Sequence, residues 1–94
     1  MIHIGYATGA YDLFQIGHLN LLRRAKEHCD YLIAGVVADD VLIKHKGVTP
    51  VIPLAERLEI VQNIRCVDAV HAAMTNDKVG DLEGPTIQRL VQGR

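Results

Sequence analysis

Short apolar runs recur along the chain and predict its strands. Ile2–Thr8 is a mostly apolar run that stops at Gly9. Tyr31–Ala38 is apolar without alternation, which is typical of a strand covered on both faces, as in a parallel sheet. Val67–Ala73 predicts a third, shorter strand.

The segment between the first two runs has helical spacing. After Gly17, the apolar residues Leu19, Leu22 and Ala25 follow one another at three-residue steps, with basic residues between them. This pattern predicts an amphipathic helix with one apolar face, which ends near Cys29.

A second helix is predicted from Pro53, because proline suits the first turn of a helix. Leu54, Leu58, Val61 and Ile64 then follow at steps of four, three and three residues, which is helical spacing.

Two further segments carry weaker patterns. Val41–Lys44 predicts a single helical turn, followed by a loop that carries Gly47 and two prolines. Thr86–Gln92 predicts a last helix with Ile87, Leu90 and Val91 facing inward. The element order is therefore β-α-β-α-β-(α), which predicts an α/β fold with a Rossmann-like parallel sheet.

Composition narrows the function. The 94 residues suit one domain, 1–94, and the formal net charge of −1 lacks the basic excess of nucleic-acid-binding proteins. The longest apolar stretch is too short to cross a bilayer. Cys29, Cys66 and the histidines match no metal-ligand spacing. We therefore expect a cytoplasmic protein without a metal site of its own and without nucleic acid or membrane insertion.

The turn between the first strand and the first helix carries the candidate chemistry. It runs from Gly9 to His18 and ends at a helix start, where unpaired N–H groups and the helix dipole favour phosphate. Gly17 lets a ligand approach the backbone. Gln15 and His18 are three residues apart and share a face in the first turn, so two hydrogen-bond donors point to one place.

The segment Gly9–His18 is similar to the G-x-(F/Y)-D-x-x-(H/Q)-x-G-H signature of the HxGH nucleotidyltransferase superfamily. Flanking segments resemble the glycerol-3-phosphate cytidylyltransferases and their choline-phosphate and ethanolamine-phosphate relatives. These segments are Gly17–Lys26, Asp30–Ile33, Ala38–Asp40, Lys44–Lys46 and Glu56–Asp68. The resemblance covers roughly the first four-fifths of the chain and implies part of a nucleotidyltransferase fold.

The resemblance implies transfer of CMP from CTP to a phosphorylated alcohol such as glycerol 3-phosphate, with release of pyrophosphate. It implies His18 and Lys46 as catalytic residues and Lys44 as a substrate-binding residue. The nucleotide-binding residues that it implies are Gly9, Ala10, Tyr11, Gln15, Ile16, Gly17, His18 and Lys46. Mg²⁺ is expected with CTP, because it bridges nucleotide phosphates.

The sequence departs from the family in two places. Gln15 stands where the family has a histidine, so this donor cannot carry a positive charge. The family's C-terminal strands and its Ser/Thr-rich helix start have no counterpart, and residues 75–94 match nothing in it. Without those strands Ile2–Thr8 becomes an apolar sheet edge, from which we expect a homodimer.

Other interpretations stay open at this point. The motif handles phosphates and does not read the base, so an adenylyltransferase is an alternative, as is a phosphate-binding or self-associating half-domain without turnover. Lys44 and Lys46 can be read as ordinary solvated lysines, and Asp39 as part of a helix cap. Arg57 can pair with a carboxylate or contact a phosphate.

Overall fold

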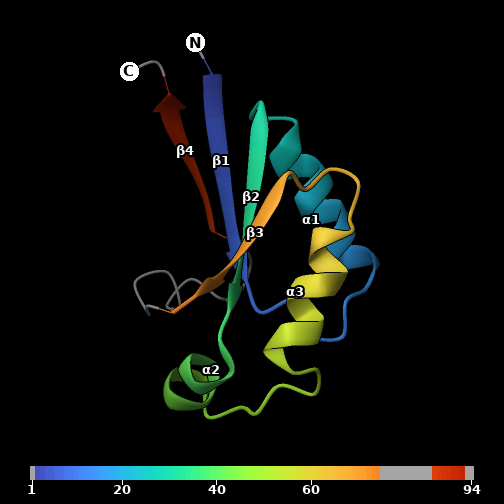
Figure 1. The fold of residues 1–94 in the computed structure, drawn as a ribbon, viewed down its shortest axis with the longest axis vertical. Coiled ribbons are helices and arrows are strands. Elements are labelled where there is room, and N and C mark those ends of the chain that lie inside the picture. Colours follow the sequence, from blue (N-terminus) through green and yellow to red (C-terminus); the bar gives the residue numbers. More distant parts are fainter. Residues whose placement is uncertain (1, 75–85, 93–94) are drawn as a thin grey trace.

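The computed structural model describes residues 2–74 and the strand 86–92. Its elements form one four-stranded sheet with three helices (Figure 1). In chain order they are β1 (Ile2–Gly9), α1 (Ile16–Lys26), β2 (Tyr31–Val37), α2 (Asp39–Lys46), α3 (Leu54–Gln62), β3 (Ala69–Ala73) and β4 (Thr86–Gln92).

The strand order is β3-β2-β1-β4, and β1, β2 and β3 are mutually parallel. Helices α1 and α3 lie on the same face of these strands (Figure 1). The α/β fold with a Rossmann-like parallel sheet is thereby confirmed. The carboxyl ends of β1 and β2 lie at the end of the sheet that α2 also occupies.

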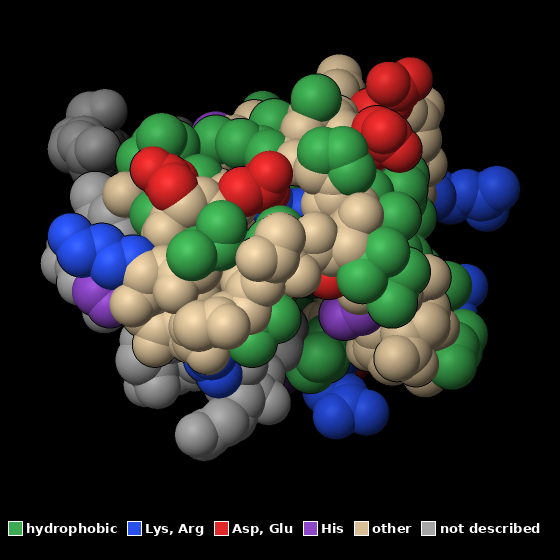
Figure 2. All heavy atoms as spheres, turned by 90° about the horizontal axis from the view of Figure 1, so that it is seen from below, with side chains coloured by type: hydrophobic (Ala, Val, Ile, Leu, Met, Phe, Trp, Pro, Cys, Tyr) green, Lys and Arg blue, Asp and Glu red, His purple; other side chains and the backbone are tan. Residues whose placement is uncertain are grey.

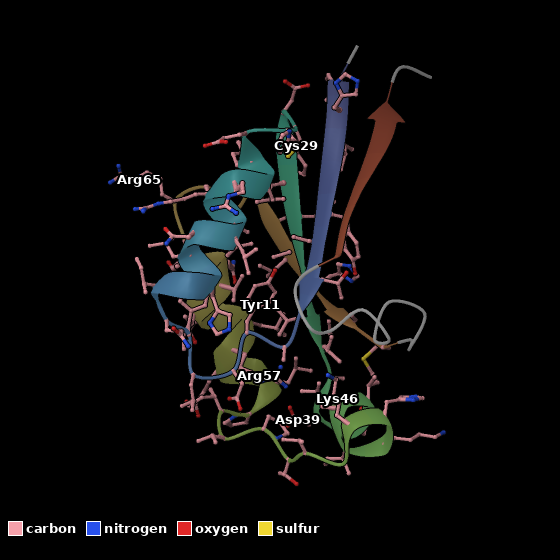
Figure 3. All side chains as sticks on the ribbon, turned by 180° about the vertical axis from the view of Figure 1, so that it is seen from behind. Tyr11, Cys29, Asp39, Lys46, Arg57 and Arg65 are labelled. Carbon is pink, nitrogen blue, oxygen red and sulfur yellow. The ribbon has the colours of Figure 1, made fainter. Side chains whose placement is uncertain are left out.

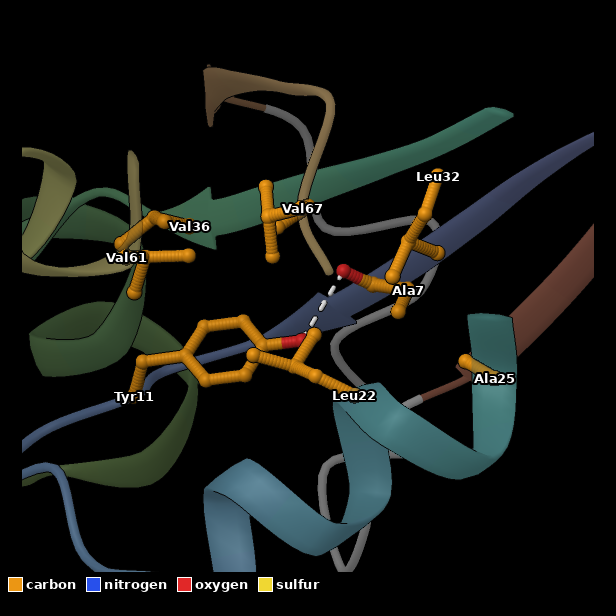
Figure 4. Packing of buried hydrophobic residues seen from close by; sticks show 9 residues of the cluster. Ala7, Tyr11, Leu22, Ala25, Leu32, Val36, Val61 and Val67 are labelled. Atoms are coloured by element: carbon orange, nitrogen blue, oxygen red, sulfur yellow. Dashed lines mark hydrogen bonds between the residues drawn. The ribbon is translucent and has the colours of Figure 1, made fainter. Parts of the chain in front are cut away.

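The core lies between the parallel strands and the two helices (Figure 4). Leu22 of α1 and Val61 of α3 are fully enclosed, and they pack against strand residues such as Leu32 and Val36. These are the apolar positions that the helical spacing and the buried runs single out. Each such large side chain gains about 1.5–3 kcal/mol from burial, so the core fixes where the strand ends lie.

The last described segment corrects the sequence-based expectation. Thr86–Gln92 is a strand and not a helix, and it runs antiparallel to β1 with Ile2 opposite Gln92 and Thr8 opposite Thr86. The free edge of β1 offers a full row of unpaired N–H and C=O groups, and pairing with them outweighs a weak helical pattern. Since β1 is not an edge, the reason for expecting a homodimer no longer applies, and the dimer stays a prediction.

Helix α2 is longer than the single turn expected from Val41–Lys44. It begins at Asp39, with two acidic residues in its first turn, and ends at Lys46, with three basic residues in its last. Both charge groups suit the helix dipole. Gly47 follows with a φ of 66°, the left-handed conformation in which glycine ends helices. Lys44 and Lys46 therefore both belong to the last turn of this helix, whereas the sequence pattern ended the helical turn at Lys44.

The helices of the described segments are short. The longest, α1, has 11 residues, which is about 16 Å at 1.5 Å per residue. Within residues 2–74 and 86–92, no helix has the length and apolar character needed to cross a membrane.

Candidate functional site

The turn that follows β1 is the centre of the candidate site. β1 ends at Gly9, α1 begins at Ile16, and the turn between them lies at the carboxyl end of the sheet. Open α/β sheets bind ligands at this end. A Cβ added at Gly9 would lie 3.3 Å from the Tyr11 ring, so the absence of a side chain there lets the chain fold back tightly. Ile16 and Gly17 are exposed at the helix start.

Gln15 and His18 are brought together at the start of α1. Gln15 is the N-cap, and its backbone N–H donates to Nδ1 of His18 at 3.1 Å. In return, the Gln15 side chain faces the His18 backbone N–H, which completes a reciprocal capping box. Because Nδ1 accepts a hydrogen bond, the proton of the neutral ring sits on Nε2. His18 therefore keeps an Nε2–H donor that binds no acceptor among the described residues.

The surroundings of His18 keep its ring neutral. The imidazole packs 5.3 Å from the Phe14 ring and 5.9 Å from the Tyr11 ring, measured between centroids. Burial lowers the pKa of His18, and the negative charge of Asp12 only partly opposes this. At neutral pH the side chain thus contributes a hydrogen bond and not a full charge.

Tyr11 lies in the core, although the family resemblance implies a place along the nucleotide. Its side chain is 2% exposed, and its hydroxyl donates to the Ala7 carbonyl at 3.1 Å (Figure 4). Burial also raises the pKa of this phenol well above its ordinary value. Tyr11 has a φ of 52°, which turns the chain sharply. Only its backbone is left to face a ligand.

A pocket of about 190 Å³ opens between this turn and α2. Its lining residues are Ala10, Asp12, Leu42, Lys46, Val48 and Pro50. Figure 2 views this end of the molecule and shows basic side chains scattered among hydrophobic ones instead of gathered in one patch. The pocket is therefore mostly apolar, with one ammonium and one carboxylate at its wall.

The structure separates the two lysines that the family resemblance pairs. Lys46 lines the pocket, whereas Lys44 is exposed and is not part of the lining. Residues two apart in a helix point in nearly opposite directions. The α2 helix therefore directs one lysine toward the site and the other away from that wall.

The contacts of Arg57 and Asp12 assign both residues to the framework of the site. Arg57 is fully buried and pairs with the Asp39 carboxylate (Figure 3), so the carboxylate alternative holds. Asp12 accepts the backbone N–H groups of Val51 and Ile52, both at 2.8 Å. Burial raises the pKa of Asp12, but these hydrogen bonds outweigh it and leave the pKa below its usual value.

Comparison with known proteins decides the family. A family model described as cytidylyltransferase-like matches residues 6–88, which include every predicted site residue. The chain belongs to the cytidylyltransferase-like family. The resemblance drawn from the Gly9–His18 motif is thereby confirmed.

Relatives of this cytidylyltransferase-like chain carry several names. Ethanolamine-phosphate cytidylyltransferase from Mus musculus is 46% identical over 65 residues, covering 69% of this chain and 16% of that protein. The protein of the same name from Arabidopsis thaliana is 43% identical over 65 residues, covering 69% and 15%. FAD synthase from Pyrococcus horikoshii is 37% identical over 82 residues, covering 87% and 53%. The chain thus spans only part of the length of these relatives.

One solved structure shares the fold of this cytidylyltransferase-like chain. The lipopolysaccharide core biosynthesis protein from Thermoplasma volcanium GSS1 superposes with a TM-score of 0.72 at 24% identity. The match covers 83% of this chain and 62% of that one. At this identity the likeness concerns the fold alone.

Proposed function

We propose that this chain transfers CMP from CTP to a small phosphorylated alcohol and releases pyrophosphate. The observation that carries the proposal is the Gln15–His18 capping box at the start of α1, beside a pocket walled by Lys46. The donors of the helix start and the Lys46 ammonium both lie at the carboxyl end of the parallel sheet, where such sheets bind phosphates. Glycerol 3-phosphate and ethanolamine phosphate are the acceptors to test, the first from the sequence motif and the second from the named relatives.

In the proposed reaction an acceptor phosphate oxygen attacks the α-phosphorus of CTP in line. The new O–P bond forms as the bond to the β-phosphate oxygen breaks, and pyrophosphate leaves with the electron pair. No covalent enzyme intermediate is needed, so the chain acts by positioning and by stabilising charge. Nε2–H of His18 and the backbone N–H groups of Ile16 and Gly17, in the first turn of α1, donate to phosphate oxygens.

The charge balance of the site gives Lys46 a distinct role. His18 is neutral because burial lowers its pKa, and Gln15 is neutral by nature. The ammonium of Lys46 is thus the full positive charge at the pocket wall among the described lining residues. We propose that Lys46 neutralises the negative charge that develops on the phosphates. We also propose that Lys44 binds the acceptor from outside the pocket.

The expected Mg²⁺ finds few ready ligands in the described part of the chain. No group of three His, Cys, Asp or Glu residues there is arranged to hold a metal ion, and both oxygens of Asp12 accept backbone N–H groups. The ion would thus be carried by the phosphates of the nucleotide. The roles proposed for His18, Gly17 and Lys46 do not depend on this ion.

The direct test follows pyrophosphate release with CTP or ATP and with each of the two acceptors. His18→Ala should lower turnover by about 100-fold, since it removes a donor at the reacting phosphate. His28→Ala, which removes an exposed histidine just beyond α1, is the matched control and should leave turnover unchanged. Normal turnover by His18→Ala would show that the site is misassigned.

An adenylyltransferase is the second candidate, and the FAD synthase relatives favour it, since their product contains an adenine nucleotide. Faster release with ATP than with CTP would establish it. No release with any pair would favour a phosphate-binding or self-associating half-domain. The homodimer and the cytoplasmic location remain proposals from the sequence.

A further inference from the structure

The guanidinium of Arg57 is hydrogen-bonded to several parts of the chain and has no part in the proposed reaction. It is 0% exposed, and its hydrogen bonds reach four residues in three separate stretches of the chain. Nε donates to the Ile52 carbonyl at 2.8 Å, and Nη1 donates to the Ala10 and Val37 carbonyls, each at 2.8 Å. Nη2 donates to the Asp39 carboxylate. Four of its five N–H donors therefore have acceptors among the described residues.

The four acceptors lie on the segments that surround the pocket. Ala10 belongs to the turn after β1, and Val37 ends β2. Asp39 begins α2, the helix that ends at Lys46. Ile52 lies in the loop whose residues Val48 and Pro50 line the pocket. Figure 3 shows Arg57 between Tyr11, in the turn after β1, and α2, with Asp39 and Lys46 on the α2 side of Arg57.

Asp12 ties two of these segments a second time. Its two carboxylate oxygens accept the N–H groups of Val51 and Ile52, while Arg57 holds the carbonyl of Ile52 from the other side. The backbone N–H and the backbone C=O of Ile52 are thus both hydrogen-bonded to charged side chains. Ala10 and Asp12 are two residues apart, so the contacts close a ring through Arg57, Ile52 and the turn after β1.

The hydrogen bonds of the buried Arg57 guanidinium give it a structural role, which is to hold these segments together. Arginine is rarely enclosed unless it is fully paired, and removing one partner of a buried pair leaves the other uncompensated. A lysine could not reproduce the arrangement, because its compact ammonium lacks the planar fork that reaches several acceptors at once. With no exposed surface, Arg57 cannot contact a phosphate in this structure.

We propose that Arg57, with Asp39 as its charged partner, is a positioning residue of the transferase site. It fixes the start of α2, the helix whose last turn carries Lys46, against the turn after β1, which leads to Gln15 and His18. The proposal rests on the proposed function for its catalytic consequence. Displacements of about 1 Å at reacting groups can lower rates by about 100-fold, so the contacts made by Arg57 set how well these groups act together.

The first test compares Arg57→Lys with Lys26→Ala. Lys26, the last residue of α1, forms an ion pair with Asp68 at 2.7 Å. Lys26→Ala breaks this ion pair, and neither residue lines the pocket. With turnover corrected for the folded fraction, kcat/KM of Arg57→Lys should fall by about 10- to 100-fold and the KM for CTP should rise. Lys26→Ala should stay within about twofold of the wild type in both. A merely destabilised protein has fewer active molecules but an unchanged KM.

The second test uses residues on α2, so that it stays informative if Arg57→Lys does not fold. Asp39→Ala removes the charged acceptor, and Asp40→Ala removes its exposed neighbour in the same helical turn. Both variants lose one negative charge at the same helix start. Only Asp39→Ala should raise the KM for CTP. Equal kinetics for the two aspartate variants would overturn the proposal.

Amide hydrogen exchange separates this proposal from the proposed function. In Arg57→Lys or Asp39→Ala, the amides of Val51 and Ile52 should exchange at least about tenfold faster than in the wild type, because the loop loses its anchor. Lys26→Ala and Asp40→Ala should leave them protected. If the wild type releases no pyrophosphate with any pair, the proposed function fails, yet this readout still decides whether Arg57 holds the pocket walls. Unchanged exchange in both Arg57→Lys and Asp39→Ala would refute it.

Discussion

Replacing Gln15 by histidine tests the phosphate-binding role of the helix start. Gln15 is the N-cap of α1, its side chain is exposed, and it shares a face with His18. A histidine here adds a donor that can carry a positive charge. Hydrogen bonds to a charged group contribute about 1.5–3 kcal/mol, against about 1 kcal/mol for neutral ones. The exchange therefore offers about 0.5–2 kcal/mol of additional phosphate binding.

One feature of the structure reduces that gain in affinity, and a second lowers the stability of the variant. The positive end of the α1 dipole opposes a cation at the N-cap by about 0.3–1 kcal/mol. The replacement also removes the glutamine half of the capping box, which lowers the free energy of unfolding by about 0.5–1 kcal/mol. The first effect acts on CTP affinity and the second on stability. The net expectation is CTP binding that is about 3- to 10-fold tighter near pH 6, where the new imidazole is charged.

Isothermal titration with CTP near pH 6 and near pH 8 measures this directly. The gain should fade at the higher pH, because the new histidine loses its charge. Gln15→Ala is the control, and it should bind more weakly than the wild type at both values. Equal or weaker binding by Gln15→His near pH 6, or a gain that is the same at both values, would refute the phosphate role of this helix start.

Three further predictions follow from the site and the core. Lys46→Ala should weaken CTP binding by about tenfold and Lys44→Ala by less than about twofold, because charged hydrogen bonds act at short range and only Lys46 lines the pocket; calorimetry with the two variants checks this, and equal losses would contradict the geometry. Tyr11→Phe should lower the free energy of unfolding by about 1 kcal/mol through the lost bond to Ala7, as measured by urea denaturation. Burial lowers the pKa of His18 in the folded chain, so the unfolded chain binds more protons below about pH 6.5. The contribution of neutral His18 to stability is therefore present above that pH and is lost as the pH falls through the lowered pKa. The urea midpoint of His18→Ala should therefore decline less steeply than that of the wild type between about pH 7 and pH 5.

The parallel strands and two of the helices follow from the sequence because their own residues determine them. The unbroken apolar run at Tyr31–Ala38 predicts a strand, and β2 is found there. The expected helix cover on both faces is not seen among the described residues, because α1 and α3 lie on the same face of the sheet. The steps of four and three residues after Pro53 leave no strand alternative. The same reasoning placed Gln15 and His18 side by side, since their geometry depends only on the first helical turn.

The misjudged parts depend on distant partners. The segment Thr86–Gln92 becomes a strand because β1 offers it an edge, and its own pattern of Ile87, Leu90 and Val91 does not reveal that partner. In the sequence Arg57 resembles a surface residue of an amphipathic helix, because its four acceptors come from three stretches of the chain that only the fold brings together. Tyr11 sits in a motif that implies a ligand, and the φ of 52° that turns it into the core has no signal in the local sequence.

The pairing of β4 with β1 has a consequence for how this unit can be joined to other chains. Ile2 and Gln92 are opposite one another in the sheet, at the end remote from the turn after β1 and from α2 (Figure 1). Added sequence could therefore leave at either terminus, or the unit could be inserted into a host loop through two neighbouring attachment points, without crossing the pocket. Such closely spaced ends are what tolerated domain insertions and circular permutations use. A fluorescent or affinity partner fused at either end should leave CTP affinity unaltered, which makes this small scaffold suitable for modular fusion.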